Sequence, residues 1–383
     1  MKKKILIVTE RRADFSRFKP VIDLIKKDKD LSYELVVTGI HLLRKYGYSI
    51  QEIKKGGYKI SKTFTMYKNI NNKLDDGATM VKSLGIAVSK LSAIVKKISP
   101  DLILSGFDIA ANFAVTLVGA HMNIPVAHIQ GGEVSGTIDE SIRHAMSKFS
   151  HYHLVSNLDA KNRLIKMGEE KKNIFIVGCP SIEALTSQKS LKRDYFKKKI
   201  GIDINKKYLI VIQHSVTTEI SSVRRQIIET LKAINKFKMQ TIFVCPNNDA
   251  GSTYIINEIK NNKENFYTPT LTLQEYKSLL EGCFALVGNS SSGIHEASTF
   301  LKPVINIGSR QNGRLRSKNI IDVNYSSSKI LKNLEKLKIV SYYKKLIKNL
   351  KNPYEKPHTS RRIVKVLKLI KLNGNVLQKK ITY

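Results

Sequence analysis

The chain alternates short runs of apolar, β-branched residues with longer segments in which apolar residues recur every three to four positions. The first pattern is typical of buried parallel strands and the second of helices that cover them. The strands predicted in the first half are Ile5–Thr9, Leu35–Thr38, Leu102–Leu104, Val126–Ile129 and Phe175–Val177. The helices predicted between them are Phe15–Lys27, Ala78–Ile98, Ala110–Met122 and Asn157–Met167. This alternation predicts a doubly wound parallel sheet.

The same alternation begins again after a charged and polar stretch, Ile182–Ile204. Its strands are expected at Tyr208–Gln213, Thr241–Cys245, Ala285–Val287 and Val304–Ile307, and its helices include Ser221–Phe237 and Leu273–Glu281. A last amphipathic segment, Ser360–Leu372, is expected to pack back on the first half. We therefore predict an α/β protein with two Rossmann-like domains facing a cleft. The expected limits are residues 1–180 for an N-terminal domain with the catalytic loops, 181–350 for a nucleotide-binding domain, and 351–383 for the C-terminal helix.

Composition adds few constraints on the class of protein. At 383 residues the chain is long enough for two full cores. Its three cysteines are too scattered for a disulfide framework or a zinc site, which fits a reducing cytoplasm. The N-terminal apolar run stops after four residues, and Ile109–Ile129 has the pattern of a buried helix followed by a strand. We expect a cytoplasmic protein without a metal, a cofactor or stable membrane insertion.

The charge is unusually positive, because 66 lysines and arginines face 31 acidic residues for a net +35. Such a charge fits either a surface for a polyanion or a bias of composition toward lysine. The lysines are spread from Lys2 to Lys380, and no aromatic-interleaved basic motif is present. We therefore expect no nucleic-acid partner, while a function for the charge stays open.

One glycine-rich loop stands out as a candidate active site. It follows the strand Val126–Ile129 and leads to a helix that begins near Ile138, and it carries Glu133 and Asp139. In open α/β sheets, ligands bind beyond the carboxyl ends of the strands. Glycines let the backbone approach a ligand, and carboxylates beside them can move protons.

A second loop has the pattern of an anion site. The segment Val287–Glu296 follows a strand and opens a helix, so backbone N–H groups and the hydroxyls of Ser290 and Ser291 can hold a diphosphate without a metal. Glu296 is then placed to accept hydrogen bonds from ribose hydroxyls. An ordinary serine cap is the alternative interpretation.

Further polar residues stand at or just after other strand ends, namely Arg12 with Ser16, His214, Asn247 and Arg310. Each alone is compatible with a capped turn. Their recurrence at so many strand ends favours one binding cleft. Neither a P-loop nor a dinucleotide-binding glycine motif after the first strand is present in the sequence, so a kinase or a dehydrogenase is not supported.

These motifs together resemble the hydrolysing UDP-N-acetylglucosamine 2-epimerases of sialic and legionaminic acid synthesis. The segments that carry the resemblance are Arg12–Asp14, Gly131–Ala145, Gly178–Ser181, Gln213–Thr218, Pro246–Ser252, Gly288–Gly293 and Ser309–Gln311. The resemblance implies a glycosyltransferase-B-like fold, a homodimer or homotetramer, and a UDP- or GDP-linked sugar as substrate. It implies nucleotide binding by Arg12, Ser16, His214, Asn247, Ser290, Ser291, Glu296 and Arg310, and proton transfer by Asp139.

The sequence departs from that family at two positions. Phe107 stands where the family has a catalytic aspartate and Asp108 where it has an arginine, while Gln130 replaces a catalytic glutamate. A glutamine forms hydrogen bonds but does not exchange protons at neutral pH. The candidates for catalysis are therefore Asp108, Glu133, Asp139, Gln130 and His214.

Four functions remain open from the sequence. The favoured one is a hydrolysing nucleotide-sugar 2-epimerase that forms a glycal intermediate and releases a ManNAc-type sugar for nonulosonic acid synthesis. The alternatives are hydrolysis without epimerisation, glycosyl transfer, and a basic protein that binds a nucleotide sugar without turnover.

Overall fold

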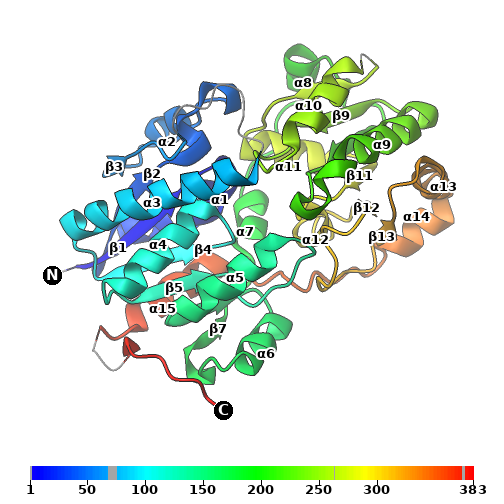
Figure 1. Cartoon of the computed structure of the whole chain (residues 1–383). Coiled ribbons are helices and arrows are strands. Elements are labelled where there is room, and N and C mark those ends of the chain that lie inside the picture. The colour runs from blue at the N-terminus through cyan, green and yellow to red at the C-terminus, as the bar shows by residue number, and fades with distance from the viewer. Residues whose placement is uncertain (1, 68–75, 263, 373–375) are drawn as a thin grey trace.

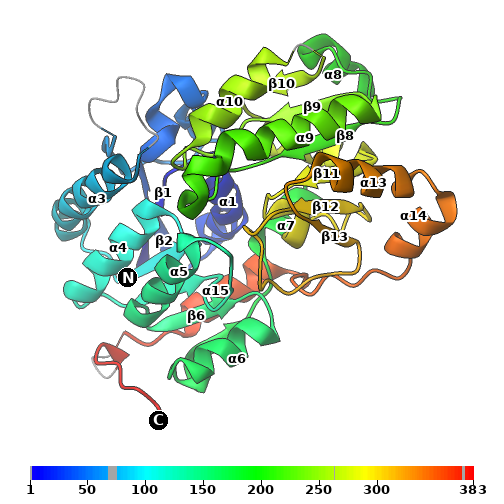
Figure 2. The same cartoon turned by 45° about the vertical axis from the view of Figure 1, so that its right-hand side comes forward.

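The protein is described here by a computed structural model that covers residues 2–67, 76–262, 264–372 and 376–383. The chain forms two α/β domains, each built on its own parallel sheet (Figures 1 and 2). The strand order is β3-β2-β1-β4-β5-β6-β7 in the first sheet and β10-β9-β8-β11-β12-β13 in the second. In both sheets the order reverses beside the first strand of the domain, as in doubly wound folds. The predicted fold class is confirmed.

The first sheet takes its strands from residues 3–176. They are β1 (Lys3–Thr9), β2 (Leu31–Val37), β3 (Lys62–Thr63), β4 (Leu102–Gly106), β5 (Val126–Ile129), β6 (Tyr152–Val155) and β7 (Ile174–Ile176). Every residue of β4, β5 and β6 is buried, because helices cover both faces of the sheet. The sequence pattern did not predict β6 or the two-residue β3.

The helices of the first domain are α1 (Arg12–Lys27), α2 (Ile50–Lys55), α3 (Gly77–Ile98), α4 (Ala110–His121), α5 (Ile138–Phe149), α6 (Leu158–Lys166) and α7 (Pro180–Thr186). Among the described helices, α3 alone has the length and apolar composition to cross a membrane. It packs on α4 and buries Ala87, Leu91 and Val95 in the core of the first domain, as a core helix of an α/β domain does.

The second sheet contains β8 (Leu209–Ile212), β9 (Thr241–Val244), β10 (Phe266–Thr268), β11 (Ala285–Gly288), β12 (Val304–Ile307) and β13 (Ile320–Val323). Its helices are α8 (Arg193–Ile200), α9 (Val223–Phe237), α10 (Ser252–Asn261), α11 (Leu273–Gly282), α12 (Ser292–His295), α13 (Ser327–Leu337) and α14 (Val340–Ile347). The apolar side chains of β8, β9 and β11 form its core with α9 and α13. Between the domains, α7 contacts helices of both, α1 and α11.

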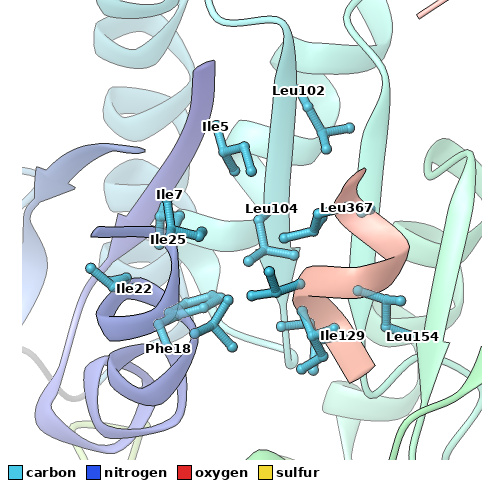
Figure 3. Packing of buried hydrophobic residues seen from close by; sticks show 14 of the residues in the cluster. Ile5, Ile7, Phe18, Ile22, Ile25, Leu102, Leu104, Ile129, Leu154 and Leu367 are labelled. Atoms are coloured by element: carbon cyan, nitrogen blue, oxygen red, sulfur yellow. The ribbon is translucent and has the colours of Figure 1, made fainter. Parts of the chain in front are cut away.

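The last helix, α15 (Thr359–Leu369), lies against the first domain although the chain reaches it only after the second (Figure 1). Leu367 packs into the same cluster as Leu104 and Phe18, as Figure 3 shows. The Lys3 ammonium donates to three carbonyls near the end of α15, those of Leu367 at 2.8 Å, Lys368 at 3.2 Å and Ile370 at 2.7 Å. Both ends of the chain therefore belong to one domain.

Two neighbouring strands of the first sheet end in the same unusual way. Phe107 follows β4 with φ of 69°, and Gln130 follows β5 with φ of 60°. Residues other than glycine adopt this left-handed conformation rarely, and such residues cluster at functional sites. Because Gly106 and Ile129 are paired in the sheet, the two turns leave it side by side.

Candidate active site

A cleft of about 330 Å³ lies where the carboxyl ends of the two sheets meet. Its lining comes from both domains, which is the usual place for a ligand in paired α/β domains. All the residues that the sequence marked as site candidates line this cleft: Arg12, Ser16, Asp108, Gln130, Glu133, Asp139, His214, Asn247, Ser290, Ser291, Glu296 and Arg310.

The turn after β4 sends Phe107 into the core and Asp108 into the cleft. Phe107 is 2 % exposed and packs against Phe18, with ring centroids 5.2 Å apart. Asp108 forms an ion pair with Arg143 of α5. Burial opposes ionisation of Asp108, but the charges of Arg143 and Arg314 outweigh it and hold its pKa well below the ordinary value. Asp108 is therefore a fixed carboxylate.

Asp139, in the first turn of α5, has the opposite protonation behaviour. Burial and the neighbouring Asp108 both raise its pKa, although Arg310 lies 3.8 Å away and acts against them. Two carboxyl groups whose surroundings drive their pKa values apart are a frequent arrangement for acid–base catalysis. Asp139 is the member of the pair whose pKa is raised, which suits it better than Asp108 to exchange a proton.

Glu133 lies in a buried polar cluster that joins the two domains. Its Oε1 accepts a hydrogen bond from Ser156 at 2.7 Å, and its Oε2 lies 2.9 Å from His295 Nε2 and 3.5 Å from Arg314. The same His295 Nε2 lies 2.9 Å from Arg314 Nη1, and burial lowers the pKa of His295. Burial raises the pKa of Glu133, but these partners outweigh that effect and bring it well below the ordinary value. Glu133 is a held anion, which suits it less to proton transfer than Asp139.

Gln130, after β5, is 3 % exposed. Its Nε2 donates to Glu133 Oε1 at 3.2 Å. Its Oε1 is buried and has no partner among the described residues. Four further residues that line the cleft also carry buried polar atoms without a partner among the described residues, namely Ser135, His295, Gln311 and Arg314. A ligand or water is the ordinary source of such partners.

His214, after β8, presents a neutral imidazole to the cleft. Its Nδ1 accepts a hydrogen bond from the backbone N–H of Asn247 at 3.1 Å, which leaves Nε2 as the N–H donor. Burial and the charge of Arg310 hold its pKa well below the ordinary value. The side chain of Asn289 fixes the His214 backbone, accepting from its N–H at 2.7 Å and donating to its carbonyl at 2.9 Å.

The serine loop after β11 carries a correction to the prediction. Ser290 and Ser291 line the cleft, but the helix that follows, α12, has only four residues and its dipole is correspondingly small. An anion at this loop therefore depends on hydroxyl and N–H groups and on Arg310, which donates to the Asn289 carbonyl at 3.3 Å. Glu296 is 5 % exposed at the end of α12.

At the mouth of the cleft, Arg12 bridges the domains. Its guanidinium pairs with Glu52 of α2 and donates to Thr270 of the second domain. Ser16, one turn further along α1, donates its hydroxyl to the Ala13 carbonyl at 2.9 Å. A nucleotide that uses Arg12 must therefore compete with Glu52.

Four site residues were missed from the sequence, namely Arg11, Arg143, His295 and Arg314. Three of them had a readable signal, because each lies four positions after a predicted site residue: Arg143 after Asp139, His295 after Ser291 and Arg314 after Arg310. In α5 that spacing is one helical turn. The contact of His295 with Glu133 has no such local signal, because it joins residues 162 positions apart.

Two parallel-sheet α/β domains that face each other across this polar cleft define an enzyme of glycosyltransferase-B-like architecture. A family model described as UDP-N-acetylglucosamine 2-epimerase matches residues 23–368. The chain belongs to the UDP-N-acetylglucosamine 2-epimerase family.

Two relatives agree with that assignment, and a solved structure agrees with the fold. The chain is 35 % identical over 382 residues to the hydrolysing UDP-N,N'-diacetylbacillosamine 2-epimerase of Legionella pneumophila, covering 99 % of each chain. It is 35 % identical over 330 residues to the UDP-N-acetylglucosamine 2-epimerase of Neisseria meningitidis, covering 86 % of this chain and 85 % of that one. A crystal structure of UDP-GlcNAc 2-epimerase from Neisseria meningitidis, bound to UDP-GlcNAc, matches the fold with a TM-score of 0.77, at 18 % identity and over 96 % of this chain and 100 % of that one.

Proposed function

We propose that the protein is a hydrolysing nucleotide-sugar 2-epimerase. Its substrate is a UDP- or GDP-linked sugar of the N-acetylglucosamine type, and its products are a nucleoside diphosphate and a free ManNAc-type sugar. The observation that carries the proposal is the carboxyl pair of Asp108, ionised beside Arg143, and Asp139, whose pKa is raised, inside a cleft between nucleotide-binding folds.

The reaction requires that a proton leave C2 while the C1–O bond breaks. The hydrogen on C2 is not acidic by itself, so bond breaking at C1 must run ahead and build positive charge on the sugar. Asp139, once ionised, accepts the C2 proton, and the electron pair of that C–H bond forms the C1=C2 double bond of a glycal. The fixed carboxylate of Asp108 stabilises the positive charge that develops, and a positioned carboxyl group contributes about 10²–10⁴-fold to such a proton transfer.

Water then completes the reaction. Its hydroxide adds at C1 and a proton returns to C2 on the face opposite to the one from which the first left. One water is consumed, and the nucleoside diphosphate and the sugar are released. This balance needs neither an oxidant nor a reductant.

The departing diphosphate needs hydrogen-bond donors. His214 offers a neutral Nε2–H, the serine loop offers hydroxyl groups, and Arg310 offers positive charge within the same cleft. Each donor aimed at the developing charge is worth about 3 kcal/mol of the barrier.

The names of the relatives support the substrate class, since one acts on a UDP-linked diacetamido sugar and the other on UDP-N-acetylglucosamine. A product of the ManNAc type fits the synthesis of nonulosonic acids. We further propose that the enzyme acts in the cytoplasm as a homodimer or homotetramer, as its family resemblance implies.

Hydrolysis without epimerisation is the second candidate, and one observation favours it. Gln130, which the resemblance aligns with a catalytic glutamate, cannot carry a proton at neutral pH, so one of the acid–base groups expected for returning the proton to C2 is missing.

Proton NMR of the purified protein with UDP-N-acetylglucosamine in D₂O tests the proposal, with parallel tubes of UDP- and GDP-linked diacetamido-trideoxy sugars. We expect a free manno-configured sugar with deuterium at C2. A free gluco-configured sugar still protonated at C2 selects plain hydrolysis. The absence of any free sugar overturns both and favours a transferase or a binding protein.

A further inference from the structure

The cleft contains a buried acceptor whose orientation is fixed by its neighbour. Glu133 is ionised and accepts only, so the Gln130 amide must turn its Nε2–H₂ toward it. The carbonyl oxygen, Oε1, is the end of the amide that remains, and it has no partner among the described residues. Orientations of amides are assigned from such networks, and here an ionised acceptor determines the assignment.

This orientation of the Gln130 amide is energetically unfavourable when no ligand is bound. A buried acceptor that lacks a donor costs about 1–3 kcal/mol. Gln130 also has a left-handed backbone, with φ of 60°, which places its side chain in the wall of the cleft. Two unfavourable features at one residue in a binding cleft point to a ligand that supplies the missing donor.

The position of Gln130 in the cleft indicates which group of the ligand would donate a hydrogen bond to its Oε1. The turn after β5 that holds Gln130 leaves the sheet beside the turn after β4 that holds Asp108. If Asp108 and Asp139 face C1 and C2 of the sugar, Gln130 lies next to the substituent on C2. In an N-acetylated sugar that substituent is an amide, whose N–H is only a donor, while the Gln130 carbonyl is only an acceptor.

We propose that Gln130 is a specificity residue whose Oε1 accepts a hydrogen bond from the N–H of a 2-acetamido group. Glu133 is the positioning residue that turns the amide, and Ser156, His295 and Arg314 hold Glu133 in place. A site built around such a hydrogen bond discriminates strongly against a ligand that lacks the donor. This inference rests on the proposed function, because it takes the C2 carbon as the reacting centre.

Two ligands that differ at C2 alone test the inference. UDP-N-acetylglucosamine has the acetamido group, and UDP-2-deoxyglucose has only hydrogen there and so lacks the donor. Their affinities, and that of UDP, are to be measured by calorimetry in an Asp139→Asn background, where turnover is expected to be lost. We expect the background protein to bind UDP-N-acetylglucosamine at least about tenfold more tightly than UDP-2-deoxyglucose.

Gln130→Leu removes the acceptor at similar side-chain size. We expect it to abolish the preference for the acetamido sugar while the affinity for UDP stays within about threefold. Because loss of packing alone lowers the affinity for both sugars together, the ratio of the two affinities separates recognition from a structural role.

Gln226 is a matched control. Like Gln130 it is 3 % exposed and donates its Nε2 to a glutamate, Glu219, at 2.6 Å, but it lies in α9 and does not line the cleft. Gln226→Leu is expected to leave the preference unchanged. A preference that survives Gln130→Leu, or that is absent before the substitution, overturns the inference. Failure to bind UDP at all contradicts the proposed function instead, and the inference falls with it.

Discussion

Both domains contribute arginines and carboxyl groups to the cleft, but the Asp108–Asp139 pair lies in the first domain, whereas His214 and the serine loop lie in the second. Asp108, Gln130 and Asp139 come from the first, and His214 and Arg310 from the second. Under the proposed function, the strand ends of the first sheet supply the proton-transfer groups and those of the second supply donors for the diphosphate. Where the two sets meet, Glu133 contacts His295 and Arg314 across the boundary.

The largest effect is expected when the first domain loses Asp139, the residue proposed to transfer the proton. Asp139→Asn removes the carboxyl group whose raised pKa suits proton transfer, so we expect turnover to fall by about 10²–10⁴-fold. The affinity for UDP should stay within a few fold, because Asp139 is not one of the residues proposed to bind the nucleotide. Initial rates and calorimetry check both, and unchanged turnover in this variant contradicts the role of Asp139.

The complementary change removes a cation of the second domain. Arg310→Ala is expected to lower kcat by roughly 10²–10³-fold and to weaken UDP binding. Because Arg310 lowers the pKa of Asp139, its loss raises that pKa further. Since Asp139 must be ionised to accept a proton, the acid limb of the kcat profile should move to higher pH. Arg224→Ala, an exposed arginine of α9, is the control and should leave the limb in place.

The buried polar cluster around Glu133, which joins the two domains, is expected to contribute to the stability of the folded protein. Glu133→Gln removes the carboxylate that Arg314 contacts, which should lower the free energy of unfolding by about 3 kcal/mol at pH 7. The pKa of Glu133 is lowered in the folded protein, so its contribution is present above its unfolded value, near 4.3, and is lost as pH falls through the lower folded value. The deficit of the variant should therefore shrink below about pH 4.

Urea unfolding at pH 7 and at pH 3.5 measures that deficit. Glu335→Gln, which breaks an exposed pair with Lys338, is the control and should cost less than about 1 kcal/mol. A deficit that stays the same at both pH values contradicts the ionised state assigned to Glu133.

The smallest effect is expected at the contact between Lys3 and the carbonyls near the end of α15. Lys3→Met removes the ammonium that caps the C-terminal end of α15, and we expect a loss of about 0.3–1 kcal/mol. Hydrogen exchange should show faster exchange in α15 and unchanged exchange in α9 of the second domain. Equal protection of α15 in both proteins excludes a role for Lys3 in docking this helix.

Much of the fold was readable because fully buried strands leave continuous apolar runs. Strand β6 was not predicted because Tyr152 and His153 begin it, and the polar side chain of His153 is buried through a tertiary contact with Glu169 that the pattern does not show. At the site, strand-end chemistry marked most of the candidate residues, whereas Asp108 and Gln130 became candidates because the sequence departs there from the family it resembles, and a one-residue shift of Asp108 into the site was one of the interpretations left open. There the decisive factor is packing against Phe18, which brings Asp108 into the cleft.

The contacts between the two domains could not be predicted from the sequence pattern, for a different reason. His295, a partner of Glu133 from the second domain, stands 162 positions away, and no periodicity links the two. The orientation of the Gln130 amide depends in turn on the charge of Glu133. Such a property exists only once both domains are in place.

The return of α15 to the first domain has a consequence for synthesis of the chain. Ile363 and Leu367 belong to the same core as Ile5 and Ile7, so the domain that leaves the ribosome first lacks part of its core until the last residues emerge. The second domain, begun later, is complete earlier. A nascent chain that has just finished its second sheet therefore exposes the apolar surface that α15 will cover, and it does so for the time needed to translate a few dozen codons.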